Sequence, residues 1–108
     1  MFAEQFLMHC QKVVEGLDRG ALEQAALALA AVREREGRLF IVGSGGGAGH
    51  ASHATCDFRK MCNIEAYAPY DNISELTARV NDEGWDVTIA NWLAVSKLTA
   101  RDGLLVFS

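Results

Sequence analysis

Long hydrophobic runs, a leader and a cysteine framework are all missing from this sequence. The longest apolar run, residues 25–32, is far shorter than the ~20 residues that a membrane-spanning helix needs. The first four residues carry neither the basic nor the apolar part of a secretory signal. The cysteines, at positions 10, 56 and 62, are odd in number and show no CxxC spacing. We therefore expect reduced thiols in a cytoplasmic protein, with Cys56 as a small buried residue.

Positive charge and proline are also scarce. Ten Lys and Arg stand against fourteen Asp and Glu, and the net charge of −4 argues against nucleic acid or an anionic membrane as the main partner. A small anionic ligand remains compatible with this charge. The single proline leaves no Pro/Ser linker, and no repeat or low-complexity segment divides the chain. The composition, half apolar and 22% charged, predicts one globular domain over residues 1–108.

Helical patterns occupy the N-terminal third. Apolar residues recur at helical spacing from Phe2 to Leu17, and an alanine-rich helical run follows to Glu36. Asp18 is a candidate N-cap of the second helix, and Gly37 a candidate C-terminal stop.

Three apolar segments separate further helical patterns in the rest of the chain. The segment RLFIVG, residues 38–43, is typical of a strand buried on both faces, and residues 104–108 give the same pattern. Asp71 or Asn72 can cap one of the helices. The remaining expected elements are a helix over 48–60, a strand over 64–69 ended by Pro69, a helix to about residue 80, a loop over 81–84 and a helix over 85–98.

This order, ααβαβααβ, predicts a three-layer α/β/α fold with a parallel sheet of about three strands. Residues 2–36 would form the helical N-terminus and residues 38–108 the α/β part. Three strands make a thin sheet, and the sequence stops at the carboxyl end of a strand, where open parallel sheets place ligand loops. We therefore expect a partial domain, completed by further chain or by a partner.

A glycine-rich turn, GSGGGAG, lies between the first strand and the next helix. Glycine lets backbone amides approach an anion closely, and a helix N-terminus adds partial positive charge. A P-loop is excluded because no Lys-Ser or Lys-Thr follows the glycines. A dinucleotide fingerprint matches loosely as Gly43-x-Gly45-x-x-Ala48, with Glu65 or Asp71 as ribose ligands, but such folds more often begin with the fingerprint strand.

Two further interpretations of this turn remain. In a sugar-phosphate site, Ser44 would supply a hydroxyl, and the glycine amides would donate to phosphate or sugar oxygens. Alternatively, the glycines serve only to let the strand and the helix pack closely.

His50, His53 and Asp57 follow at spacings of three and four, which place them on one face of the helix. Imidazole and carboxylate in this arrangement suit a divalent metal such as zinc, with further ligands from elsewhere. Asp57 could also act as a general base beside a bound sugar. A solvated polar stripe, or a simple His53–Asp57 pair, explains the spacing equally well.

Taken together, LFIVGSGGG, HASHATCD, DNISELTARVNDEGWD and DGLLVFS resemble the sugar isomerase (SIS) domain family. Within that family they are similar to the phosphoheptose isomerases, which act on sedoheptulose 7-phosphate. The resemblance covers nearly the whole chain and implies an SIS-like fold.

By this resemblance, some of the family's functional positions fall on residues of this chain, whereas the rest of its Ser/Thr loop and its distal Gln and His ligands lie beyond residue 108. His53 and Asp57 stand at the metal-binding His and at the metal-binding, catalytic Glu. The substrate-binding positions fall on Ser44, Gly45, Gly46, Gly47, Asp71 and Ser108. Two of these residues depart from the family pattern: Asp57 is one methylene shorter than Glu, and Gly47 lacks the hydroxyl of the family's serine.

The implied chemistry is aldose–ketose isomerisation of a phosphosugar through an enediol, with Asp57 moving a proton between C1 and C2. A divalent metal, for which zinc is the candidate, or hydrogen-bond donors would stabilise the developing oxyanion. The resemblance also implies a homo-oligomer, and the apolar stripe of Phe2, Phe6, Cys10 and Val13 suits a helical subunit interface or packing within the domain. A non-catalytic phosphosugar-binding domain and a nucleotide-binding oxidoreductase remain as alternatives.

Overall fold

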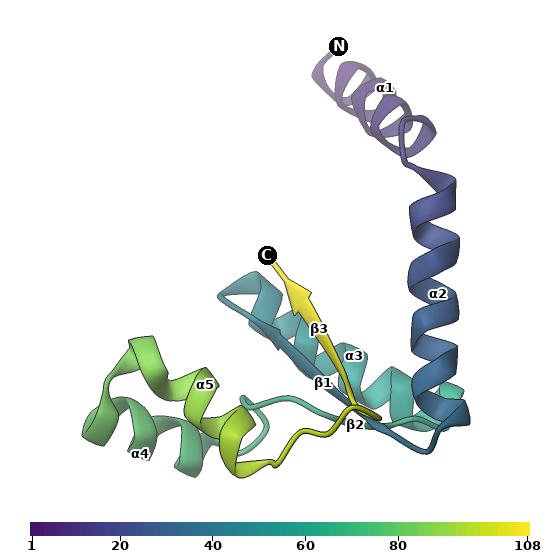
Figure 1. Ribbon diagram of the computed structural model, residues 1–108. Helices are drawn as coiled ribbons and strands as arrows, with labels where there is room; N and C mark the ends of the chain where they lie inside the picture. Colours follow the sequence, from purple (N-terminus) through teal and green to yellow (C-terminus); the bar gives the residue numbers. More distant parts are fainter.

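The computed structural model describes residues 1–108 and contains five helices and three strands (Figure 1). Their order, ααβαβααβ, is the predicted one. The elements are α1 (Phe2–Glu15), α2 (Arg19–Glu34), β1 (Arg38–Gly43), α3 (Gly46–Cys62), β2 (Glu65–Tyr67), α4 (Ile73–Glu83), α5 (Trp85–Val95) and β3 (Gly103–Phe107). None of the helices is long and apolar enough to cross a membrane.

The first two helices form an arm that extends away from the sheet (Figure 1). Helix α1 buries none of its residues, and α2 buries only Val32, close to its carboxyl end. The predicted cap of α2 is confirmed, because the Asp18 carboxylate accepts a hydrogen bond from the Ala21 amide at 3.0 Å. The arm therefore contacts the rest of the chain mainly through the end of α2.

The sequence indicated Gly37 as the C-terminal stop of α2, and this prediction is wrong. The helix ends at Glu34, and it is Glu36 that adopts the left-handed conformation, with φ of 55°. A Cβ atom on Gly37 would lie 1.8 Å from the Arg101 carbonyl oxygen. Glycine is therefore required here because two chain segments approach each other closely.

The sheet is parallel and has the order β2–β1–β3. Strand β1 lies in the centre, with Phe40 opposite Tyr67 of β2 and Leu104 of β3. Phe40 and Ile41 are almost completely buried, which confirms the prediction for this strand.

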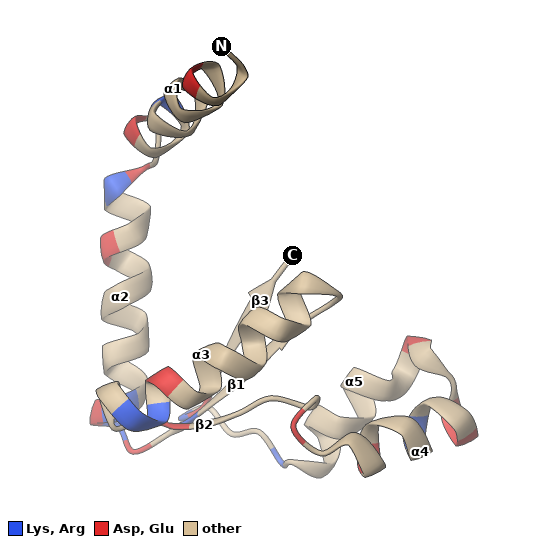
Figure 2. Cartoon of the chain, turned by 180° about the vertical axis from the view of Figure 1, so that it is seen from behind, with Lys and Arg blue, Asp and Glu red and all other residues tan.

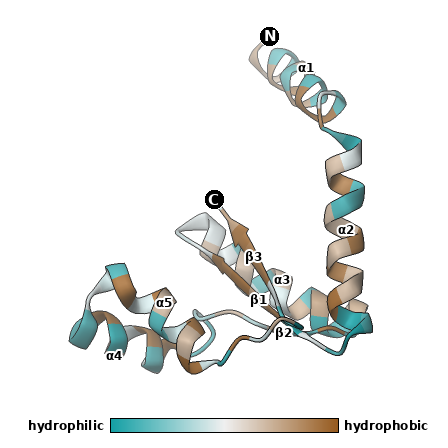
Figure 3. Ribbon diagram, in the orientation of Figure 1, coloured by the Kyte–Doolittle hydropathy of each residue, from teal (hydrophilic) through white to brown (hydrophobic).

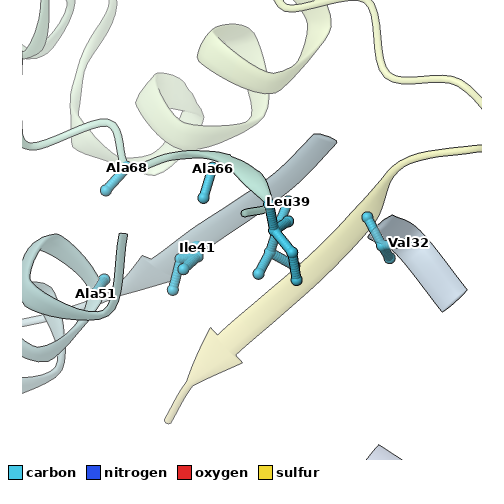
Figure 4. Close-up of a cluster of buried hydrophobic side chains, with 7 residues drawn as sticks. Val32, Leu39, Ile41, Ala51, Ala66 and Ala68 are labelled. Atoms are coloured by element: carbon cyan, nitrogen blue, oxygen red, sulfur yellow. The ribbon is translucent and has the colours of Figure 1, made fainter. Parts of the chain in front are cut away.

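Helices cover both faces of β1. On one face, Leu39 and Ile41 pack with Ala51 of α3, with the alanines of β2 and the loop after it, and with Val32 (Figure 4). On the other face, Phe40 and Val42 pack against Trp92 of α5, whose ring meets that of Phe40 edge-on at 5.5 Å. The predicted three-layer α/β/α arrangement is confirmed.

Several details differ from the sequence-based expectations. Strand β3 is an edge strand, and its Leu104 and Val106 side chains are exposed rather than buried. This edge of the sheet is therefore apolar (Figure 3). Helix α4 continues through the expected 81–84 loop to Glu83, where Gly84, with φ of 89°, breaks it. Cys56 is exposed, because it lies on the outer side of α3.

At the amino end of the sheet, β1 and β3 are joined by a polar cluster around Asp102, whose side chain is 4% exposed. Its carboxylate accepts from the Arg38 amide at 2.8 Å, from the Arg38 guanidinium at 2.9 Å and from the Thr99 amide at 2.8 Å. Burial raises the pKa of Asp102, but these hydrogen bonds outweigh it and lower the pKa from 3.8 to about 2. Every polar atom of the carboxylate has a partner here.

Candidate functional site

The glycine-rich turn is shorter than predicted. Strand β1 ends at Gly43 and α3 begins at Gly46, two residues before the expected start, so the turn itself is Ser44 and Gly45. Gly45 has a positive φ of 56°. A Cβ on Gly43 would lie 2.4 Å from the Gly47 carbonyl oxygen. The glycines thus allow both the sharp turn and the close packing of the helix start on the strand end.

Three successive backbone amides in this turn have no partner within the chain. The amides of Gly47 and Ala48 donate to the carbonyls of Ser44 and Gly45, at 2.9 and 3.1 Å. By contrast, the amides of Ser44, Gly45 and Gly46 make no hydrogen bond to any other group of the protein, and all three residues are exposed. Consecutive free amides at a helix N-terminus favour binding of an anion.

A cavity of about 500 Å³ opens beside these amides, at the carboxyl ends of β1 and β3. This volume suits a small-molecule ligand. Its wall on the side of the sheet includes Ser44 and Ser108, two predicted substrate-binding residues, so the fold brings them together. The full lining is Val42, Gly43, Ser44, Tyr70, Trp85, Asp86, Ile89, Val106, Phe107 and Ser108.

The electrostatics of the cavity are unusual for an anion site. No Lys or Arg lines it, and Asp86 is its one charged side chain. The start of α3 and the carboxyl ends of β1 and β3 lie in a stretch without charged residues (Figure 2). Attraction for an anion must therefore come from backbone amides, hydroxyls and the dipole of α3.

Of the five lining residues that carry polar side-chain atoms, three were not predicted from the sequence. Trp85 and Asp86 are the first residues of α5, and they line the cavity only because α5 packs against the sheet, which a local pattern does not reveal. Tyr70 follows β2, and its hydroxyl bonds the backbone of Gly43, 27 residues away. The sequence offered one indication of this contact: two neighbouring parallel strands end at the same edge of a sheet, so the loop after β2 was expected to pass close to the glycine turn.

Asp71 lies outside this cavity. Its carboxylate accepts a hydrogen bond from the Ser52 hydroxyl of α3. It borders an adjacent surface groove together with Thr55, Cys56, Arg59 and Lys60. Asp71 is thus next to the turn and its helix, but separated from the wall formed by Ser44 and Ser108.

The two metal-site candidates pair with each other on α3. His53 Nε2 lies 3.3 Å from Asp57 Oδ2, and the side chains are 78% and 49% exposed. Ligand atoms on a tetrahedral zinc, each about 2.0 Å from the ion, are separated by about 3.3 Å, so the spacing fits two of four ligands. No group of three or more His, Cys, Asp or Glu side chains gathers on this chain. His50 instead meets the Phe107 ring edge-on at 6.3 Å, beside the cavity.

Comparisons with known proteins agree with this architecture. No protein-family model matches the chain. The sequence is 30% identical to a phosphoheptose isomerase of Helicobacter pylori, over 98% of this chain and 58% of that protein. The structure matches phosphoheptose isomerase GmhA from Neisseria gonorrhoeae with a TM-score of 0.81 and 24% identity, over 100% of this chain and 61% of that one.

The chain thus spans about three fifths of the length of each relative. The structural match shows a common fold, and the sequence match extends over almost all of this chain. The chain therefore has the α/β fold of the solved phosphoheptose isomerase GmhA, and its sequence is similar over almost its whole length to part of a phosphoheptose isomerase.

Proposed function

We propose that this protein is a sugar-phosphate isomerase that interconverts an aldose and a ketose phosphate, with sedoheptulose 7-phosphate as the first substrate to test. The observation that carries the proposal is the row of free amides at Ser44, Gly45 and Gly46 beside a ligand-sized cavity. The H. pylori relative named phosphoheptose isomerase supports the same substrate class.

In this proposal the phosphate lies at the start of α3. The amides of Ser44, Gly45 and Gly46 donate to its oxygens, and the hydroxyls of Ser44 and Ser108 add two donors from the same wall. Gly47 contributes by allowing close packing, since a Cβ there would lie 3.0 Å from the Phe107 carbonyl oxygen. Asp71 would contact the sugar hydroxyls from the adjacent groove.

Asp57 is the proposed catalytic carboxylate. It would take a proton from the carbon next to the carbonyl, which leaves an enediolate, and return that proton to the former carbonyl carbon. The proton of the neighbouring hydroxyl would pass to the former carbonyl oxygen, so that no atom is gained or lost. Hydrogen-bond donors would stabilise the negative charge on the oxygen. Phosphate binding at the turn would keep the sugar in register during these steps.

His53 and Asp57 are the proposed metal ligands, with zinc as the candidate ion and the remaining ligands from outside the pair. Their position on one exposed face of α3, with side-chain atoms 3.3 Å apart, is compatible with a shared ion and equally with a direct His–carboxylate pair. A divalent ion would supply Lewis-acid stabilisation of the developing oxyanion. Zinc titration by calorimetry tests it: His53→Ala should abolish a site seen in the parent protein, and unchanged zinc affinity in that variant would rule out the assignment.

We also propose that residues 1–108 form one SIS-like unit within a cytoplasmic homo-oligomer. Support for the oligomer comes from α1, where Phe2 and Val13 are 82% and 67% exposed and nothing in the chain covers them. Burying such side chains against a second copy is favourable. Sedimentation of the parent protein and of a Phe2→Ser, Phe6→Ser variant tests this, because only the parent should associate.

The decisive experiment is an assay of the full-length protein with sedoheptulose 7-phosphate, with and without added zinc. Turnover that falls at least a hundredfold in Asp57→Asn, with phosphosugar binding retained, would support the proposed role. Absence of turnover in the parent protein under both conditions would contradict isomerase activity.

One observation favours a second candidate, a phosphosugar-binding domain without catalysis. Asp57 does not line the cavity, whereas the amides and hydroxyls needed for binding lie on or beside its wall. Calorimetry with phosphosugars alongside the assay separates the two functions: tight binding with no turnover would identify a sensor rather than an enzyme.

A further inference from the structure

We propose that Tyr70 is a positioning residue of the anion-binding turn: its hydroxyl fixes the end of β1 and thereby sets where the free amides of Ser44, Gly45 and Gly46 lie. This inference rests on the proposed sugar-phosphate site. It gives a role in this site to Tyr70, which the sequence analysis did not include among the site residues.

The Tyr70 hydroxyl binds both polar backbone groups of Gly43. It accepts a hydrogen bond from the Gly43 amide at 2.8 Å and donates one to the Gly43 carbonyl. One side chain therefore satisfies a donor and an acceptor of the same residue, which fixes Gly43 more firmly than a single bond would.

The Tyr70 hydroxyl forms hydrogen bonds with backbone groups of β1 that a longer β2 would otherwise pair with. The pairing of β2 with β1 ends at Tyr67 opposite Phe40, so no residue of β2 reaches Gly43. On the other side, Gly43 is opposite Phe107 of β3. The Tyr70 hydroxyl is thus what holds the last residue of β1 on the β2 side, where a pair of unsatisfied backbone groups would be costly.

The position of Gly43 is transmitted directly to the helix start. There is no space for even a methyl group between Gly43 and Gly47, and Gly47 in turn packs against Phe107. The free amides lie in the segment between Gly43 and Gly47. If the strand end moves, these amides must move with it.

The loop that carries Tyr70 is also tied to α3. The next residue, Asp71, accepts a hydrogen bond from Ser52, one turn beyond the glycines. Consecutive residues therefore hold the strand and the helix that flank the turn. Tyr70 itself lines the cavity, so a ligand bound there would lie beside its side chain.

The test removes one hydroxyl at a time from the full-length protein. Tyr70→Phe deletes both bonds to Gly43 and keeps the ring. Tyr67→Phe is the matched control, because the Tyr67 hydroxyl donates only to Glu65 on the protein surface. Affinity for inorganic phosphate and for sedoheptulose 7-phosphate is measured by calorimetry. Amide hydrogen exchange is followed at Gly43, Gly47 and Ala48, the hydrogen-bonded amides of residues 43–48.

We expect Tyr70→Phe to weaken the binding of both ligands by roughly tenfold and to speed exchange at the turn by a similar factor, in line with the loss of part-buried hydrogen bonds. Tyr67→Phe should change neither. A purely structural role would lower the melting temperature of Tyr70→Phe but leave the dissociation constant of the folded protein unchanged, and that result would overturn the proposal.

Failure of the proposed function gives a different result. If the parent protein binds neither phosphate nor the phosphosugar, the sugar-phosphate assignment is wrong, and hydrogen exchange still decides whether Tyr70 orders the turn. Equal exchange rates at the hydrogen-bonded amides of residues 43–48 in the parent, Tyr70→Phe and Tyr67→Phe would overturn the positioning role whatever the ligand data show.

Discussion

The two ends of β1 use their polar groups in opposite ways. At the amino end, the Asp102 carboxylate accepts hydrogen bonds from Arg38 and Thr99, and Gly37 packs against Arg101 with no space for a side chain. At the carboxyl end, three successive amides have no partner in the chain and a cavity opens beside them.

This difference separates stability from function along one strand. Polar groups that satisfy each other hold β1 and β3 together, but they have no capacity left for a ligand. Free amides contribute little to folding, yet they are available to an anion that enters the cavity. Substitutions at the amino end should therefore change the free energy of unfolding, and those at the carboxyl end should also change ligand affinity.

The largest effect is expected from Asp102→Ala. This change leaves the amides of Arg38 and Thr99 and the Arg38 guanidinium without their acceptor at a nearly buried position. We expect a loss of about 3–5 kcal/mol in the free energy of unfolding, measured in urea. The dissociation constant for inorganic phosphate, measured on the folded protein, should stay the same.

Glu75→Ala serves as the control for Asp102→Ala. It also removes a carboxylate paired with an arginine, Arg79, but this pair joins neighbouring turns of α4 and its carboxylate is 33% exposed, against 4% for Asp102. Its loss should cost only about 0.3–0.5 kcal/mol. Equal costs for the two variants would contradict the special role of the Asp102 cluster.

A pair of glycine substitutions sharpens the comparison further. A Cβ at Gly37 or at Gly43 would collide with backbone atoms, at 1.8 and 2.4 Å, so either alanine variant should lose about 2–3 kcal/mol of stability. Only Gly43→Ala displaces the start of α3, and so only this variant should also weaken phosphate binding. Weaker phosphate binding in Gly37→Ala would mean that the two ends of the strand are coupled.

Acidification tests the amino end alone. Because hydrogen bonds lower the pKa of Asp102 to about 2 in the folded protein, its contribution is complete above the unfolded pKa near 4 and is lost as the pH falls through about 2. The stability difference between the parent and Asp102→Asn should thus shrink by about 2 kcal/mol between pH 5 and pH 2. A difference that stays constant over this range would show that the carboxylate charge is not what matters.

Local patterns predicted most of the fold. The apolar run in β1, the Asp18 cap and the Asn72 cap all depend on neighbouring residues, and the structure contains each of them. The errors concern contacts between distant segments. Gly37 was interpreted as a helix stop because its steric conflict with Arg101, 64 residues away, leaves no local sign.

The same limit applies to the candidate site. The strand–glycine–helix pattern predicted amides free to bind an anion, and the structure contains three free amides in this turn, while anion binding itself stays a prediction. Tyr70, Trp85 and Asp86 were missed because they reach the cavity through the course of the loop after β2 and through the packing of α5 against the sheet. The metal and catalytic roles of His53 and Asp57 remain predictions, because the structure brings only these two groups together.

The smallest predicted effect concerns the charge inside the cavity. Asp86 is the one charged side chain of a lining without Lys or Arg, so its carboxylate opposes the approach of a phosphate. We expect Asp86→Asn to improve the affinity for inorganic phosphate by about two- to threefold at low salt, and the gain should fade as added salt screens the repulsion. Calorimetry at two salt concentrations measures both effects, and Asp18→Asn, which removes a carboxylate from the distant helical arm, is the control for net charge. Asp86→Asn could instead weaken phosphosugar binding and leave the affinity for inorganic phosphate unchanged. That result would mean that the carboxylate accepts hydrogen bonds from sugar hydroxyls, so that the carboxyl end of β1 binds the phosphate through amides and the sugar through a charged group.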